Sequence, residues 1–153
     1  MKKASIIWIL LLIGPFLYSF KAFMDEQEWI TWGNRFLTES YDPSTEAKIK
    51  KWEISLTPDH FIRLQKTYQQ GKREYYSFNL QRFNGLEYVP GQAATDTLEM
   101  KTQADDIIIQ TFDDPKGDID SMGTILDIPV KKLAPERLDS LKQALQFLKA
   151  KSL

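Results

Sequence analysis

The stretch FIRLQKTYQQGKREYYSFNLQRF, residues 61–83, decides the expected fold because it has the pattern of an antiparallel hairpin. Apolar and polar side chains alternate on both sides of the segment 71–73, which is typical of two strands joined by a turn. A register that places Leu64 opposite Leu80 leaves one face of the pair apolar and the other polar. Because a half-buried antiparallel pair needs one face of each kind, the sequence predicts a hairpin in that register.

The β pattern extends on both sides of the hairpin, from about residue 44 to about residue 130. Asn84 and Gly85 form a dipeptide that is typical of a tight turn, so they predict a sharp connection into the next strand. Short connections between consecutive strands favour a meander over parallel units. The strands are expected at about residues 52–56, 61–69, 74–83, 86–89, 96–101, 107–112 and 123–130.

An amphipathic helix is expected before the strands, over about residues 25–39. Asp25 and Glu28 have the spacing of a helix N-cap and its capping-box partner. An aromatic stripe that includes Trp29 and Trp32 follows at helical spacing. This stripe can pack on the domain, or it can rest on a lipid interface, and the sequence leaves both interpretations open.

The chain is expected to end in a second helix, which starts near Pro135 and carries a leucine stripe. Such a stripe packs against a sheet or forms a seam with a partner helix. The predicted fold class is therefore α+β: an antiparallel β-meander or partly closed barrel of about six or seven strands, with an N-terminal amphipathic helix and a C-terminal capping helix. This order of elements is similar to that of pleckstrin-homology-like barrels and, more loosely, of small lipocalin-like barrels. The resemblance implies a barrel and no particular function.

The first residues have the layout of an export segment of bacterial type. A basic start at Lys2 and Lys3 precedes an apolar run over residues 4–20, which is long enough to approach the thickness of a bilayer. Cleavage after Ala22 would place Phe20 three residues before the cut, which is a poor signal-peptidase site. We therefore expect an uncleaved single-pass anchor in the inner membrane, with the N-terminus in the cytoplasm and the rest of the chain exported.

A cleaved signal peptide, which would release a periplasmic or secreted domain, is the alternative. A buried helix of a soluble protein is a third possibility, which the unbroken apolar run disfavours. The expected organisation is a membrane segment or signal over residues 1–23, the amphipathic helix and a linker over 24–43, and the β domain with its C-terminal helix over 44–153.

Composition excludes several kinds of chemistry. The chain has no cysteine, so disulfides, thiolate metal sites and thiol catalysis are absent. Residues 1–23 hold three lysines and no acid, so the remainder carries 17 basic and 21 acidic residues, a formal charge of −4. That acidic balance disfavours nucleic acid as a partner. His60 is the single histidine, and we expect it exposed in a turn. The sequence predicts no enzyme and no cofactor.

The acidic stretch DDPKGDID, residues 113–120, is the best candidate for a calcium site, although it also reads as a soluble hairpin turn. Its candidate metal ligands are Asp113, Asp114, Asp118 and Asp120. A pair of carboxylates that converge from distant positions could act as a hydrolase, but no pair stands out.

The candidate ligand or partner residues are Tyr68, Tyr76, Trp29 and Trp32. The two tyrosines lie opposite each other in the predicted register, near the rim of a curled sheet, where they suit a small amphipathic ligand or a peptide. The sequence favours a non-enzymatic binding domain that is tethered outside the membrane and meets a protein partner or lipid. The alternatives are a secreted periplasmic barrel that carries a small apolar ligand, or an inhibitor or immunity-type protein.

Overall fold

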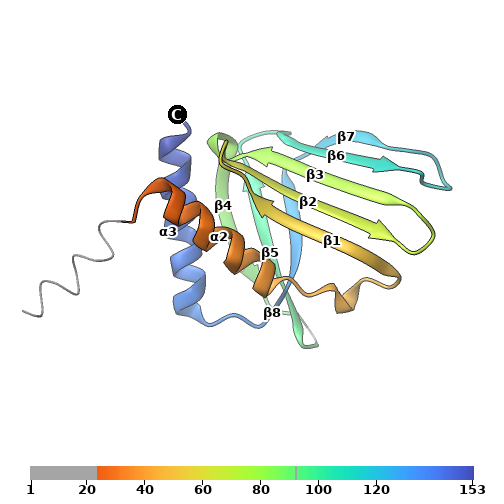
Figure 1. The fold of residues 1–153 in the computed structure, drawn as a ribbon, viewed down its shortest axis with the longest axis horizontal. Coiled ribbons are helices and arrows are strands. Elements are labelled where there is room, and N and C mark those ends of the chain that lie inside the picture. Colours follow the sequence, from red (N-terminus) through yellow and green to blue (C-terminus); the bar gives the residue numbers. More distant parts are fainter. Residues whose placement is uncertain (1–23, 92) are drawn as a thin grey trace, which may run out of the picture.

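The computed structural model describes residues 24–91 and 93–153, which form two helices and two antiparallel sheets (Figure 1). The α+β class is confirmed at this level. The helices are α2 (Glu26–Ser40) and α3 (Pro135–Lys151), and the short 3-10 helices are η1 (Pro43–Thr45) and η2 (Leu80–Arg82). The strands are β1 (Ile49–Leu56), β2 (Phe61–Tyr68), β3 (Arg73–Asn79), β4 (Phe83–Val89), β5 (Thr95–Thr102), β6 (Ile107–Phe112), β7 (Asp120–Gly123) and β8 (Ile125–Lys131).

The strands form a five-stranded sheet in the order β1-β2-β3-β6-β7 and a three-stranded sheet in the order β4-β5-β8. The two sheets do not close into a barrel, so the expectation of a partly closed barrel is wrong. The continuous meander is also wrong, because β3 pairs with β6 and β5 pairs with β8. Helix η2 causes the break: it redirects the chain after Asn79, whose side chain accepts a hydrogen bond from the Gln81 N–H (2.8 Å).

The β2–β3 hairpin has the predicted faces but a different register. Leu64 lies opposite Tyr76 rather than Leu80, so the predicted pairing is wrong. The turn closes earlier than expected because the Tyr68 N–H donates to the Lys72 carbonyl (2.8 Å) and Gly71 adopts a φ of 98°. Only glycine takes such a conformation without cost. Since the partner shifts by an even number of residues, the apolar and polar faces are preserved.

The dipeptide Asn84-Gly85 does not form the predicted turn. Both residues lie inside β4, where the pairing with β5 is irregular between Phe83 and Gly85. The change of direction expected here is made by η2, immediately before β4. Pairing with β5 therefore outweighs the local turn preference of this dipeptide.

Helix α2 is fixed to the edge of β1 by close packing and by one amide side chain. The Asn34 side chain donates to the Leu56 carbonyl (2.6 Å) and accepts from the Leu56 N–H (2.7 Å), so it acts as a short strand partner. A Cβ on Gly33 would meet the Leu56 side chain at 2.8 Å, which explains why the helix can approach so closely. The predicted capping box of Asp25 and Glu28 is confirmed.

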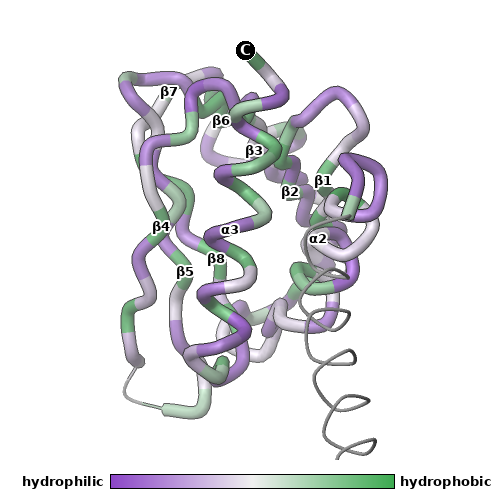
Figure 2. The backbone as a smooth tube through the Cα atoms, turned by 90° about the vertical axis from the view of Figure 1, so that its left-hand side faces the viewer, coloured by the Kyte–Doolittle hydropathy of each residue, from purple (hydrophilic) through white to green (hydrophobic). Residues whose placement is uncertain are grey.

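The two helices share the hydrophobic core with both sheets. Helix α3 runs along the three-stranded sheet (Figure 2) and buries Leu141, Leu145 and Leu148 completely. Trp29 of α2 lies 6.1 Å from Phe147 of α3 between ring centroids, so the aromatic stripe packs on the domain. Within residues 24–91 and 93–153, neither helix has the length and apolar character needed to cross a bilayer. The membrane segment predicted over residues 1–23 lies outside the described residues.

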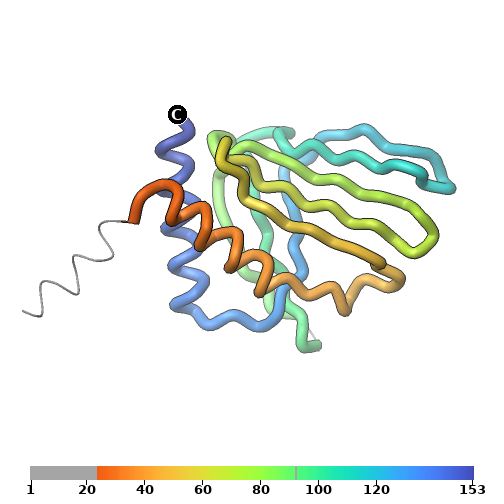
Figure 3. Tube along the Cα trace, viewed as in Figure 1, coloured from red at the N-terminus to blue at the C-terminus, as the bar shows by residue number. Residues whose placement is uncertain are grey.

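The five-stranded sheet extends away from the helices. Figure 3 shows that the β2–β3 and β6–β7 connections lie at the same end of this sheet, far from α2 and α3. Ile62 of β2 and Phe78 of β3 are buried in the hydrophobic core. The candidate site lies between this sheet and the three-stranded sheet.

Candidate functional site

A cleft of about 370 Å³ lies between the two sheets. We define the inter-sheet cleft by its lining residues: Thr45, Glu46, Lys66, Tyr76, Thr97, Ile125, Leu126, Asp127 and Pro129. Strands β2 and β3 contribute one wall, and β5 and β8 contribute the other. The last residue of η1, Thr45, and the next residue, Glu46, complete the lining. Segments far apart in the sequence therefore meet at this site.

The most buried charge in the cleft is the ammonium group of Lys66. The residue is 8% exposed, on a strand face whose preceding members, Ile62 and Leu64, are fully buried. Its Nζ atom lies 2.7 Å from Glu46 Oε1 and 5.6 Å from the centre of the Tyr76 ring. A buried lysine needs an opposite charge nearby, and Glu46 provides it.

Three tyrosine hydroxyls bind the two carboxylates beside Lys66. Tyr41 donates to Glu46 Oε1 (3.1 Å), and Tyr76 donates to Glu74 Oε2 (3.1 Å). The Tyr68 hydroxyl lies between the two acids, 3.2 Å from Glu46 Oε2 and 3.1 Å from Glu74 Oε2.

A second lysine completes the network at the end of the sheet. Lys72 Nζ lies 3.1 Å from Glu74 and 3.2 Å from Asp114, and these bonds raise the pKa of the Lys72 ammonium. The pKa of Asp114 is lowered because its carboxylate accepts from the Lys116 N–H and from Lys72. The charges behind the inter-sheet cleft are therefore fixed by mutual pairing.

The pKa values of Tyr41, Tyr68 and Tyr76 are all raised well above the usual value, mainly by burial. The negative charge of Glu46 adds to the effect at Tyr41, and that of Glu74 adds to it at Tyr68 and Tyr76. All three phenols therefore stay protonated and act as hydrogen-bond donors. An arrangement of protonated phenols and paired charges suits ligand binding better than proton transfer.

The two predicted tyrosines do not lie opposite each other, because Tyr76 pairs with Leu64, but both hydroxyls donate to Glu74. Tyr76 lines the cleft, and Tyr68 is not among the lining residues. Glu46, Lys66, Thr97 and Asp127 were not predicted from the sequence. Lys66 carried a signal, because it occupies a core-facing position in the alternation of β2. No sequence pattern indicated Thr97 or Asp127, since only the packing of the two sheets brings these residues to Tyr76.

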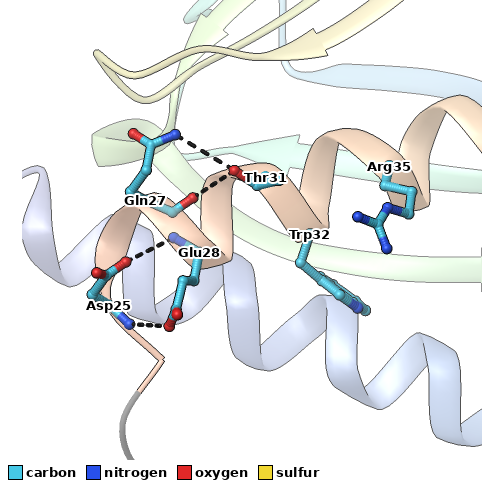
Figure 4. A pocket seen from close by; sticks show the side chains of 6 residues that line it. All are labelled: Asp25, Gln27, Glu28, Thr31, Trp32 and Arg35. Carbon is cyan, nitrogen blue, oxygen red and sulfur yellow. Dashed lines mark hydrogen bonds between the residues drawn. The ribbon is translucent and has the colours of Figure 1, made fainter.

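The predicted partner residues Trp29 and Trp32 lie elsewhere, on α2. Their rings pack edge to face with centroids 5.9 Å apart, and they contact the core. Trp32 borders a hollow along α2 that also includes Arg35 (Figure 4). The other polar side chains of this hollow bind within α2, as the Asp25–Glu28 capping box shows, so it offers fewer free groups than the inter-sheet cleft.

The four aspartates of the acidic stretch bind separate partners. Asp113 pairs with Arg73 (3.2 Å), and Asp114 pairs with Lys72. Asp118 accepts from the Asp114 N–H, and Asp120 accepts from Gln110. In the part of the chain that the structure describes, no three acidic or histidine side chains gather closely enough to hold a metal ion.

His60 occupies the predicted turn between β1 and β2, but it is buried rather than exposed. Its Nε2 atom lies 2.5 Å from Glu26 at the start of α2, and its Nδ1 atom lies 2.6 Å from the Ser152 hydroxyl at the end of α3. Ser152 also donates to the Leu148 carbonyl, so this acid–histidine–serine row acts as a connection between three elements.

Comparison with family models, with curated proteins and with solved structures gives no match to this chain.

Proposed function

We propose that this chain is a non-enzymatic binding domain, tethered to the outer face of the inner membrane by residues 1–23, which recognises its partner through the inter-sheet cleft. The observation that carries the proposal is the ordered network beside the cleft. Lys66, Glu46 and the three tyrosines are held in place by one another, so their polar groups are oriented before a ligand arrives. Preorganisation of this kind reduces the entropic cost of binding.

The position of α2 supports the tether. This helix begins at Glu26, directly after the predicted membrane segment, and it packs against both β1 and α3. A domain fixed in this way to its first helix is held close to the membrane surface. No residue of α2 or α3 is among the residues that line the cleft, so a partner outside the membrane can reach it without displacing either helix.

The character of the cleft favours this proposal over a carrier of a small apolar ligand. A carrier needs an enclosed apolar cavity, whereas Glu46, Lys66 and Asp127 place charges in the inter-sheet cleft. An inhibitor that blocks one enzyme remains compatible with the same surface, and it would differ by having a single tight protein partner.

The experiment uses the full-length chain expressed in a Gram-negative host. We expect its full-length mass in the membrane pellet after a carbonate wash, and we expect protease added to spheroplasts to digest the exported part. A photo-crosslinking amino acid at Thr97 should form an adduct in these cells, and the same amino acid at Asp139, on the exposed side of α3, serves as the control. A chain found in the cytoplasm, or equal adducts at both positions, would contradict the proposal.

A further inference from the structure

The free polar groups of the inter-sheet cleft include both donors and acceptors. In the described part of the chain, no side-chain hydrogen bond engages Thr45, Thr97 or Asp127. Lys66 has three ammonium hydrogens, of which the contact with Glu46 uses one. A ligand therefore meets N–H donors on one wall and a carboxylate acceptor on the other, with threonine hydroxyls that can do either.

This mixture disfavours a ligand that carries a single strong charge. An anion that approached Lys66 would also meet Glu46 and Asp127, and a cation drawn to Asp127 would meet Lys66. Groups that donate and accept at the same time fit the mixture best, because each of them can bond to both walls. Alcohol hydroxyls and peptide amides have this property.

The topology favours hydroxyls over a peptide. Peptides commonly bind by adding a strand to a free sheet edge, which uses main-chain hydrogen bonds. Three of the four strands that line the cleft have no free edge, because β2 and β3 are interior strands and β5 lies between β4 and β8. Strand β8 is an edge strand, and its outer side is engaged at one end, through the bridge between Tyr41 and Val130 and the bond from the Asp42 N–H to the Pro129 carbonyl (2.9 Å). Recognition in the cleft therefore depends mainly on side chains.

The cleft also offers apolar surface beside its polar groups. The half-buried Tyr76 ring, Ile125 and Pro129 lie among the lining residues. A sugar ring has hydroxyls at its edge and C–H groups on its faces, so it can use both kinds of surface at once. A volume of about 370 Å³ is at the small end of the usual range for ligand sites and suits a short saccharide.

We infer that the inter-sheet cleft binds a neutral, hydroxyl-rich ligand, a saccharide, with Lys66, Thr97 and Asp127 as its hydrogen-bonding groups and Tyr76 as its apolar contact. This inference rests on the proposed function, since it names the ligand class of the same cleft.

The test is an NMR titration of the ¹⁵N-labelled full-length chain in phosphocholine micelles, which have no sugar headgroup. The probes are cellotriose, maltotriose and tri-N-acetylchitotriose, compared with spermidine, citrate and trialanine. We expect at least one trisaccharide to shift the amide signals of residues 66, 97 and 127. Asp127→Ala and Thr97→Val should each weaken that binding about tenfold, the effect of losing one good hydrogen bond. Asp139→Ala, an exposed acid on α3, is the matched control.

Binding of spermidine, citrate or trialanine at these amides in preference to the sugars would overturn the inference, as would sugar binding that neither cleft variant weakens. If no trisaccharide binds while the adduct at Thr97 still forms, the saccharide class is wrong and the proposed function stands. If both the sugars and the adduct fail, both proposals are wrong.

Discussion

The Lys66 ammonium lies 2.7 Å from the Glu46 carboxylate, on the strand face that also carries the core residues Ile62 and Leu64. The side chains are 10% and 19% exposed, so each charge has lost most of its hydration. Removal of one partner leaves the other charge buried and uncompensated, which is much more costly than breaking a surface pair.

We therefore predict that Lys66→Ala lowers the free energy of unfolding by about 3 kcal/mol. Replacement of both charges, in Lys66→Met with Glu46→Leu, should recover much of that loss, because no unpaired charge remains. Urea denaturation of the wild type, of Lys66→Ala and of the double variant provides the measurement. Lys101→Ala, which removes a more exposed ion pair with Glu87, is the control and should have a much smaller effect. Equal losses in Lys66→Ala and Lys101→Ala would show that the Glu46 pair is not desolvated.

The row of Glu26, His60 and Ser152, in which the histidine is buried, predicts a stability effect in both helices. His60 has a φ of 65°, a conformation that asparagine and glycine tolerate well. His60→Asn and His60→Gly therefore remove the side-chain bonds with little backbone strain. Each should cost about 1–2 kcal/mol, and hydrogen exchange should rise in the first turn of α2 and the last turn of α3. Faster exchange confined to the β1–β2 turn would contradict a connection between the helices.

The hairpin of β2 and β3 shows which part of this fold local sequence determines. Its two faces were predicted correctly because the side-chain alternation of a strand depends only on neighbouring residues. The register of the hairpin was not predicted correctly, since the register depends on the position of the turn, which closes at Gly71. The pairing of β3 with β6 was also missed, because it joins segments separated by β4 and β5 and by the change of direction at η2.

The candidate site also contains residues that a local sequence pattern predicts and residues that only the tertiary packing brings there. Tyr68 and Tyr76 were identified because they concentrate on one local hairpin. Lys66 could have been identified from its position in the alternation of β2. Asp127 belongs to the cleft only because β8 joins a second sheet that packs against the first, and no local pattern contains that information.

The turn at Gly71 gives a direct test of the observed register. Gly71→Ala places a side chain at a φ of 98°, although no atom stands within 4 Å of the added methyl group. The cost is therefore one of backbone strain, about 1–2 kcal/mol in the free energy of unfolding. Gln70→Ala, at the neighbouring position of the same turn, should change stability much less. If Gly71→Ala left the free energy of unfolding unchanged, the turn would not close at this residue.

The buried phenols predict a loss of stability in alkaline solution. The pKa of Tyr76 is raised in the folded chain by burial and by Glu74, whereas in the unfolded chain this phenol ionises near its ordinary value of about 10. Above that pH the folded chain holds more protons than the unfolded chain, so the free energy of unfolding falls as pH rises. We expect Tyr76→Phe to flatten the fall between about pH 9 and 11, because phenylalanine has no proton to lose. Urea denaturation of the two chains across this range measures the slope directly, and parallel curves for wild type and Tyr76→Phe would contradict a raised pKa at this position.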